Sequence, residues 1–434
     1  MSSRLKQVTS EFTVFVDGKT RNFVVLLTYS VLSSIFGPTS RSGGGGQYIP
    51  LYIVALGGTP AMLGLLRSIE RAVRSGLSIP IGWMMDMYNL KKLMLIGMGF
   101  QFFSPIVYIL VGDVGFHLWW AIPSTIIDAL ARTLTMYSTF LLIAKSVRDK
   151  DRATGYSMRM TFSMIPGLVT PMLWAYIVGN FGGINVSGIR PVFFVMIIGH
   201  TISTLWIYLK LDVSNSERLP SPRGKKPPAK KQLLNFVHNL RKTSKIAKGT
   251  RRWILISCFD MYCISSIMGF TELFAVKIKG ADPFILGLMT VALTASSLLL
   301  TIPMGKLGDK IGRKKIMYIG LPPTYAWILL LLYAPAPDYL VVSWIFYGLW
   351  WATWSVWSVI SIELVPEAHR GKFTGVQGFF TNLVSIPGSL AAGLMWTLFD
   401  PTLPFIVALA SESIAVILAK TIPETLKKGD QHLS

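Results

Sequence analysis

The chain has 434 residues, of which 52% belong to the hydrophobic set and only 15% are charged, and its mean hydropathy is +0.51. Soluble domains carry about 25% charged residues, so this composition excludes an ordinary soluble enzyme and a disordered tail. The formal net charge of +21 would suggest nucleic-acid binding in a soluble protein. Here the basic residues lie between long apolar segments, so the positive charge has an explanation other than nucleic-acid binding.

Twelve apolar segments follow one another, each long enough to cross a hydrocarbon core of ~30 Å as a helix. They are predicted at 23–54, 61–85, 92–111, 117–145, 154–179, 190–210, 253–277, 284–305, 315–334, 338–364, 372–398 and 403–422. The first is over-long and interrupted by glycines 43–46 and then Pro50, so a kink is expected there. The first 22 residues are mixed and polar and predict no signal peptide. We therefore expect an all-α polytopic membrane protein with 12 transmembrane helices.

Lysine and arginine are divided unevenly between the two sides of this arrangement. Of the 42 basic residues, 31 lie in the termini and in the predicted loops on the same side as the termini, whereas Arg190, Lys277 and Lys279 lie on the other. Because basic loops favour the cytoplasm, both termini are predicted to be cytoplasmic, in a plasma or cytoplasmic membrane. The excess of positive charge is explained as a topology signal, and no nucleic-acid partner is predicted.

The longest predicted loop separates six helices from six. The predicted organisation is a cytoplasmic segment 1–22, a six-helix bundle 23–210, a basic linker 211–252, a second six-helix bundle 253–422 and a tail 423–434. From Lys231 to Lys248 the linker has a helical pattern of apolar residues among basic ones. This pattern is typical of an interfacial amphipathic helix, with a solvated linker as the alternative.

The two halves contain copies of one segment. Shifting the sequence by 223 positions aligns the second predicted helix with the eighth without a gap and gives 13 identities in 38 positions. The identical pairs include Pro60 with Pro283 and Asp86 with Asp309. Because an even number of helices separates the copies, they share one orientation in the membrane. Parallel six-helix repeats of this kind occur in a large class of transporters, which predicts two bundles related by a parallel pseudo-two-fold axis.

The segment GKLGDKIGRKK at 305–315 is similar to the inter-helix signature of the major facilitator superfamily, and GWMMDMYNLKK at 82–92 is a weaker copy. The first copy has Asn89 and Leu90 where the second has Gly312 and Arg313. The resemblance covers about 20–425 and implies alternating access between two bundles. It also implies a charge relay that latches the cytoplasmic side, while a plain topology-setting basic loop is the alternative. The residues of this expected gate are Gly82, Asp86, Lys91, Gly305, Asp309, Gly312, Arg313, Lys314, Arg152, Glu363 and Arg370.

Ionisable residues inside the predicted spans are expensive, so each is a candidate for function or for a buried pair. Helix 61–85 carries Arg67, Glu70, Arg71 and Arg74 within one arc of about 100°. Helix 117–145 carries Asp128 and Arg132 at i,i+4. The stripe on helix 61–85 is absent from the repeated helix 284–305, and asymmetry of this kind favours function over scaffold.

Two interpretations of these charges remain open. In the first, arginines bind an anionic substrate through forked hydrogen bonds, while a buried carboxyl group carries the coupling proton. In the second, the stripe is a neutralised ion-pair network that forms part of the external gate. A row of tryptophans at 350, 354 and 357 could stack on an organic substrate or be ordinary aromatic packing. The expected substrate-binding residues are Arg41, Arg71, Arg74, Asp128, Arg132, Trp350, Trp354 and Trp357, and the expected proton carriers are Asp128, Asp260 and Glu272.

The sequence thus predicts a secondary transporter that moves a small organic solute, expected to be anionic, by proton-coupled alternating access. The segments ELVPEAHRG at 363–371 and IPET at 422–425 are similar to those of sugar porters and metabolite permeases. A multidrug or lipophilic-compound exporter remains an alternative, as does a sensor or assembly factor on the same scaffold. The expected partners are the solute, the lipid bilayer and protons, and the expected state is a monomer. No enzyme activity, cofactor or metal is predicted, because the five histidines are scattered and no catalytic constellation is recognisable.

Overall fold

The computed structural model describes residues 21–37, 44–111, 117–147, 152–212, 249–365 and 369–424, and within these ranges all regular structure is helical. The first half contains α2 (Arg21–Phe36), η1 (Gly45–Gln47), α3 (Tyr48–Ala55), α4 (Pro60–Met87), α5 (Leu90–Gln101), α6 (Phe103–Leu110), η2 (Leu118–Trp120), α7 (Ala121–Ser146), α8 (Arg152–Met164), η4 (Ile165–Leu168), α9 (Thr170–Asn180) and α10 (Val186–Lys210). The second half contains α12 (Thr250–Ile267), α13 (Thr271–Lys277), α14 (Pro283–Ile311), α15 (Arg313–Tyr333), α16 (Tyr339–Glu363), α17 (Arg370–Leu398), α18 (Leu403–Leu418) and η7 (Ala419–Thr421).

Helical segments lie at every range that hydropathy predicts. In the described part of the chain, nine of them are long and apolar enough to cross a membrane. α4 is long enough but carries the charged stripe, and α2 is shorter, with 16 residues. The predicted amphipathic helix at 231–248 lies outside the described residues. The all-α polytopic fold is confirmed.

Several predicted spans are made of two helical pieces, each with a local cause. In the first, α2 ends at Phe36 and η1 begins at Gly45, ahead of Pro50, which lies in the first turn of α3. The fifth is broken by a 3-10 turn at Ile165–Leu168, where Pro166 cannot donate a backbone hydrogen bond. The seventh is broken at Gly269, whose φ of +89° is a left-handed conformation that glycine adopts without strain.

The repeated helices begin in the same way. Thr59 caps α4 by accepting a hydrogen bond from the backbone N–H of Met62, and Asp282 caps α14 by accepting one from Ile285 at 2.7 Å. A proline follows each cap, at the position where its missing N–H costs nothing. Since these residues correspond under the 223-residue shift, the internal repeat is a repeat of local structure.

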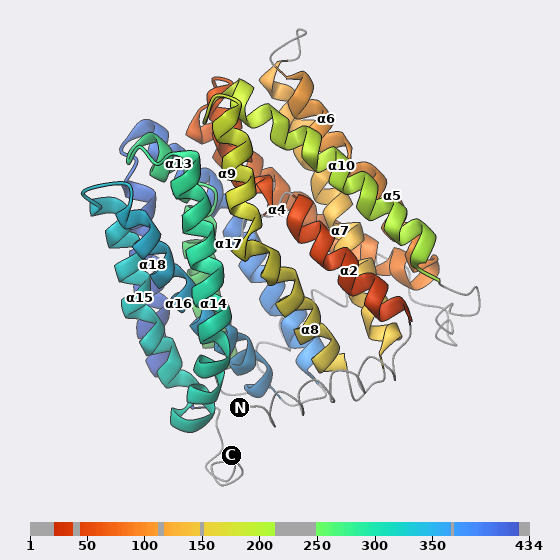
Figure 1. Cartoon of the computed structure of the whole chain (residues 1–434). Helices are drawn as coiled ribbons and strands as arrows, with labels where there is room; N and C mark the ends of the chain where they lie inside the picture. Colours follow the sequence, from red (N-terminus) through yellow and green to blue (C-terminus); the bar gives the residue numbers. More distant parts are fainter. Residues whose placement is uncertain are drawn as a thin grey trace, which may run out of the picture.

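Helices of the first and second halves lie on opposite sides of the molecule (Figure 1). Across the junction α4 packs against α17, and α9 packs against α14. One hydrophobic cluster, which includes Tyr52, Phe193, Phe274 and Trp327, contains residues of both halves. Two further clusters each belong to a single half. These two lie near the helix ends that carry the basic loops, so the halves are joined at one end and packed separately at the other.

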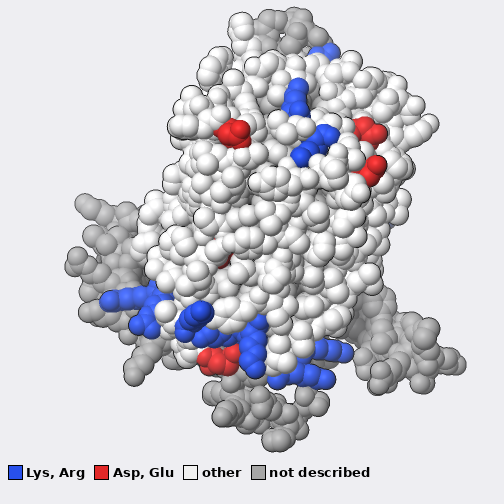
Figure 2. Space-filling model, turned by 90° about the vertical axis from the view of Figure 1, so that its left-hand side faces the viewer, with Lys and Arg blue, Asp and Glu red and all other residues white. Residues whose placement is uncertain are grey.

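We call the end of the bundle formed by Lys91, Lys210, Arg251, Lys310 and Lys315 the basic end, and the other the closed end. Figure 2 shows most lysine and arginine of the displayed face at its lower end, a smaller group of basic and acidic residues near its upper end, and a broad belt with almost no charge between them. Large apolar side chains such as Tyr176, Leu299 and Ile417 are exposed. A belt of this kind suits lipid contact, because apolar surface is stable in hydrocarbon.

Candidate functional site

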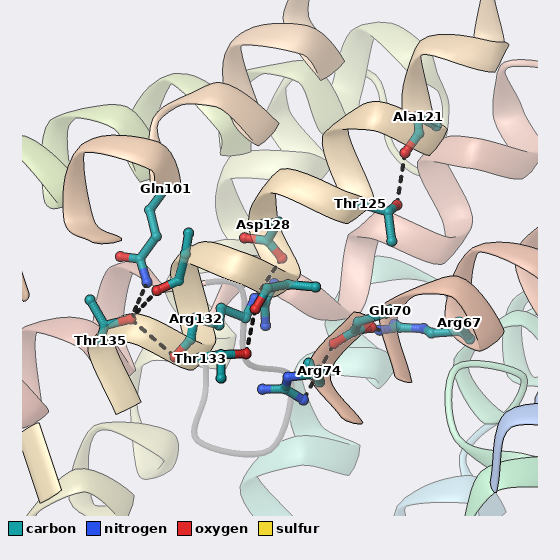
Figure 3. A network of polar contacts seen from close by, with 12 residues as sticks. Arg67, Glu70, Arg74, Gln101, Ala121, Thr125, Asp128, Arg132, Thr133 and Thr135 are labelled. Carbon is teal, nitrogen blue, oxygen red and sulfur yellow. Dashed lines mark hydrogen bonds and ion pairs between the residues drawn. The ribbon is translucent and has the colours of Figure 1, made fainter. Parts of the chain in front are cut away.

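The charged stripe of α4 forms a connected ion-pair group. The Glu70 carboxylate lies 3.1 Å from Nη1 of Arg67 and 3.5 Å from Nη1 of Arg74. One turn of helix separates each arginine from Glu70, so the helix itself sets the spacing. From Pro60 the rise of 1.5 Å per residue places Arg74 about 21 Å into the helix, near mid-membrane depth. Figure 3 shows this group beside α7.

The second ion pair lies on α7, which packs against α4. The Nε of Arg132 donates to Oδ2 of Asp128 at 2.5 Å, and Asp128 is 8% exposed (Figure 3). Glu70, Asp128 and Arg132 line the wall of one cavity, which brings the two ion pairs together. The predicted i,i+4 pair is therefore present, and it shares one charge network with the stripe of α4.

A cavity of about 40 Å³ borders this network. Its wall includes Arg67, Glu70, Tyr108, Asp128 and Arg132, from α4, α6 and α7, and α3 closes it. A smaller cavity of about 10 Å³ lies on the other side of Asp128, beside Gln101 and His200. One water needs about 10–15 Å³ by such a measure. The larger cavity therefore has room for a few waters, and it lies inside the first half, not between the halves.

The closed end is made by close helix contacts between the halves. A Cβ on Gly64 of α4 would lie 2.5 Å from the carbonyl oxygen of Ser389 in α17. Ser68 donates a hydrogen bond of 2.5 Å to the Ile386 carbonyl, and Thr397 accepts one of 3.0 Å from Ala61. Small residues let the two backbones approach, and these hydrogen bonds hold α4 and α17 together.

Two further contacts across the halves are related by the internal repeat. The Arg67 guanidinium lies against Gly269, where an added Cβ would be 3.2 Å from its Nε. Thr290, the repeat equivalent of Arg67, donates a 2.7 Å hydrogen bond to Gln47. Under the 223-residue shift, Gln47 is equivalent to position 270, directly after Gly269. At these two equivalent contacts between the halves, the first half therefore contributes a charged residue, Arg67, and the second half a neutral one, Thr290.

A second polar cluster lies inside the second half, where α12, α16 and α18 meet. The indole N–H of Trp354 donates to Oδ2 of Asp260 at 3.2 Å, and that of Trp350 donates to Oε1 of Glu412 at 3.5 Å. Both carboxyl groups are buried, at 4% and 1% exposure. Glu412 is not among the proton carriers expected from the sequence. The available signal was a lone carboxylate in an otherwise apolar helix.

The other predicted site residues are distributed as follows. Arg41 lies outside the described residues. Arg71 is half-buried on α4. Trp357 is buried against Trp253, with ring centroids 6.0 Å apart, and Trp350 packs on Trp327 at 5.9 Å. Glu272 accepts a hydrogen bond from its neighbour Thr271 near the closed end, on α13 and apart from Asp260 on α12.

At the basic end, the second copy of the signature forms a compact cluster around Arg313. Its guanidinium pairs with Asp309 one turn earlier and lies 3.5 Å from Glu363 at the end of α16. Glu424 caps α15 by accepting from the backbone N–H of Arg313 at 2.9 Å. Gly312 permits this approach, since a Cβ there would lie 2.5 Å from the Glu424 carboxylate. Lys314 donates to the carbonyl oxygen of Ile422 at 2.8 Å.

The first copy is built differently. Asn89 caps α5 by accepting from the backbone N–H of Lys92 at 3.2 Å, so this helix needs no carboxylate from the tail. Lys91 donates to the carbonyl oxygens of Tyr208 and Leu211 at the end of α10. Asp86 lies in α4, but its side chain is outside the description. Of the remaining predicted gate residues, Arg152 donates a hydrogen bond to the Ala144 carbonyl and Arg370 is exposed. Gly82 and Gly305 have open space around the Cβ position.

The sequence profile of the Major Facilitator Superfamily matches residues 22–282 and 253–432, which together span both halves. The chain belongs to the major facilitator superfamily. It is a multi-pass membrane protein with a transporter fold, and the expected family membership is confirmed.

The chain is also similar to a curated protein and to solved structures. The chain is 25% identical over 302 residues to the "Multi-drug resistance efflux pump PmrA homolog" of Lactococcus lactis, which covers 67% of this chain and 68% of that protein. Its fold matches the xylose transporter XylE from E. coli, in an inward open conformation, with a TM-score of 0.66, 16% identity and coverage of 94% and 96%. It also matches the nucleoside transporter NupG with a TM-score of 0.67, 15% identity and coverage of 92% and 98%. At these identities the solved structures establish the fold alone.

The Arg313 cluster gives a testable expectation for this superfamily member. Replacing Glu424 by alanine removes the cap of α15, and we expect the protein to lose about 0.5–2 kcal/mol of stability. Glu424→Gln keeps one acceptor oxygen and is expected to lose less. The melting temperature of the purified protein measures both changes. An alanine variant as stable as the wild type would show that the tail does not support α15.

Proposed function

We propose that this protein is a secondary active transporter that moves a small organic solute with an anionic group by proton-coupled alternating access. Family membership supports transport by a helical bundle in a membrane. The solute would bind between the halves near mid-membrane depth, as in transporters built from parallel repeats. The protein would work as a monomer in a plasma or cytoplasmic membrane, with the basic end facing the cytoplasm.

The contacts between the halves support alternating access. Close packing at Gly64 and the hydrogen bond from Ser68 to Ile386 join the halves at the closed end. At the basic end each half has its own hydrophobic cluster. When the halves are joined by a limited contact at one end, they can exchange that contact for one at the other end. This arrangement supports a state in which the solute site is reached from the basic end.

The observation that carries the anionic assignment is the charge balance of the network. Arg67, Arg74 and Arg132 share two carboxylates, Glu70 and Asp128, which leaves one positive charge in excess at membrane depth. Arg74 makes the longest of the ion pairs, and 41% of its side chain is exposed. Since a guanidinium at this depth is expensive without a partner, Arg74 has both the charge and the access to bind a carboxylate or phosphate in a forked geometry.

A thermal-shift screen tests this proposal. The purified protein would be heated with monocarboxylates, dicarboxylates, sugar phosphates, neutral sugars and lipophilic cations. A ligand that binds the folded state raises the melting temperature by mass action. We expect stabilisation by an anion, its loss in Arg74→Gln, and its retention in Arg190→Gln, which removes an arginine outside the network. Stabilisation by neutral sugars or cations alone would contradict the anionic assignment.

A lipophilic-compound exporter is the second candidate, and one observation favours it. The named efflux pump homologue is 25% identical to this chain over 302 residues. In that case the half-exposed Trp351 and Trp354, with ring centroids 5.1 Å apart, would offer an aromatic surface. If lipophilic cations stabilise the protein, the effect should persist in Arg74→Gln and disappear in Trp354→Ala. That result would support export, and the arginines would then be a structural part of the closed end.

A further inference from the structure

Asp260 and Glu412 are 152 residues apart in the chain, and the packing of α12 against α18 brings their helices together. The Oγ of Ser411 donates to the Phe259 carbonyl at 2.7 Å, so the residues directly before Glu412 and Asp260 are in contact. Trp350 and Trp354, one turn apart on α16, hold one carboxyl group each. The two carboxyl groups therefore form a pair, held between three helices.

Each carboxyl group of this pair has one satisfied and one unsatisfied oxygen. The indole N–H groups occupy Oδ2 of Asp260 and Oε1 of Glu412. The other two oxygens, Oδ1 of Asp260 and Oε2 of Glu412, are buried without a hydrogen-bond partner. In the described part of the chain neither residue forms an ion pair. Two ionised carboxylates in this position would be desolvated and would repel one another without a cation to balance them, which is costly for buried charges.

The surroundings indicate which ligand relieves this conflict. Cys263 is buried one turn after Asp260 on α12. Tyr325 of α15 forms a hydrogen bond with Ser413, the residue after Glu412. From α17, Gln377 reaches Ser257 of α12 and is neutral. A metal ion such as Na⁺ or Ca²⁺ needs about six oxygen ligands, and the pair has two free oxygens. A proton needs two, one to carry it and one to accept the hydrogen bond.

We propose that Asp260 and Glu412 form a proton-binding pair, in which a proton on one carboxyl group is shared with the free oxygen of the other. When α12, α16 and α18 move and water reaches the pair, the proton leaves to water and the pair gains one negative charge. The indole groups of Trp350 and Trp354 keep the carboxyl groups oriented in both states. The role of the pair in coupling protons to transport rests on the proposed function. Its ability to bind a proton does not depend on that function.

Carbodiimide labelling tests the pair without any substrate. Dicyclohexylcarbodiimide reacts with protonated carboxyl groups in apolar surroundings, and mass spectrometry of peptides from the full-length purified protein locates the label. We expect label on Asp260 or Glu412 that declines as the pH is raised. In Glu412→Gln the decline at Asp260 is expected at a lower pH, because the neighbouring negative charge no longer opposes ionisation. Asp338→Asn, in an exposed loop of the same half, should leave both unchanged.

The melting temperature gives a second reading. Alkaline pH places two negative charges in the pair, so the wild-type melting temperature should fall, and it should fall less in Glu412→Gln than in Asp338→Asn. Absence of label at both positions at every pH, or equal pH dependence in the two variants, would overturn the proposal. If labelling fails while solute transport persists, only the pair is refuted. If labelling succeeds and no solute is transported, the pair stands and the transport function falls.

Discussion

Replacing Arg132 by glutamine is expected to destabilise the protein by about 3–5 kcal/mol and to abolish transport. The substitution leaves the Asp128 carboxylate buried at 8% exposure without the guanidinium that lies 2.5 Å away. A buried charge that loses its partner keeps the full cost of desolvation. Chemical unfolding of the purified protein and uptake into proteoliposomes measure the two effects.

Two variants separate the ion pair from a general effect of losing an arginine. Arg67→Gln removes a partner of Glu70, but Arg74 remains 3.5 Å from that carboxylate, so a much smaller loss is expected. The double variant Asp128→Asn with Arg132→Gln removes both charges and should recover most of the stability, since neutral groups cost less to bury. Equal losses in Arg132→Gln and Arg67→Gln would mean that the Asp128–Arg132 pair has no special role.

The helices and the first-half network follow closely from the sequence, because both depend on local periodicity. Hydropathy locates the spans, and helical spacing alone brings Arg67 and Arg74 to Glu70 and Arg132 to Asp128. The 223-residue shift also anticipates that α4 and α14 begin alike. These features need no knowledge of how distant segments meet.

Contacts between distant segments could not be predicted in this way. The cap of α15 comes from Glu424, 111 residues beyond Arg313, and nothing near Arg313 indicates it. The Asp260–Glu412 pair depends on α12 meeting α18, which a single sequence does not report. The depth of Asp128 was predictable, but its orientation toward a cavity inside the first half depends on how α3, α4, α6 and α7 pack.

The asymmetry between the halves gains a physical meaning from these contacts. Arg67 and Thr290 occupy equivalent positions, and each touches the opposite half near the break of the facing helix. The scaffold therefore needs a contact there, but it does not need a charge. Charges that the scaffold does not require are the ones to assign to solute or proton binding. The same argument supports the proposal that Asp260 and Glu412 of the second half bind a proton.

Enlarging Gly64 is expected to prevent the closed end from forming. In Gly64→Val the new Cβ would lie 2.5 Å from the Ser389 carbonyl and 3.1 Å from Cα of Gly393, so α4 and α17 must separate. Overpacking of this kind costs about 1–3 kcal/mol, which disfavours the closed end by about one to two orders of magnitude. Solute exchange should fall accordingly, because every cycle passes through this contact.

Gly76→Val is the matched control, since it lies on the same helix and has no atom within 4 Å of its Cβ position. Both substitutions add one side chain to α4, so any shared effect reflects helix propensity. The opening can be followed at Ala61→Cys, in a background with Cys258 and Cys263 replaced by alanine, by its reaction with a maleimide that does not cross membranes. Faster labelling in Gly64→Val than in Gly76→Val would mean that the end near Ala61 opens. Equal labelling rates, with exchange intact, would instead mean that α4 and α17 separate freely and that the close contact at Gly64 does not control access.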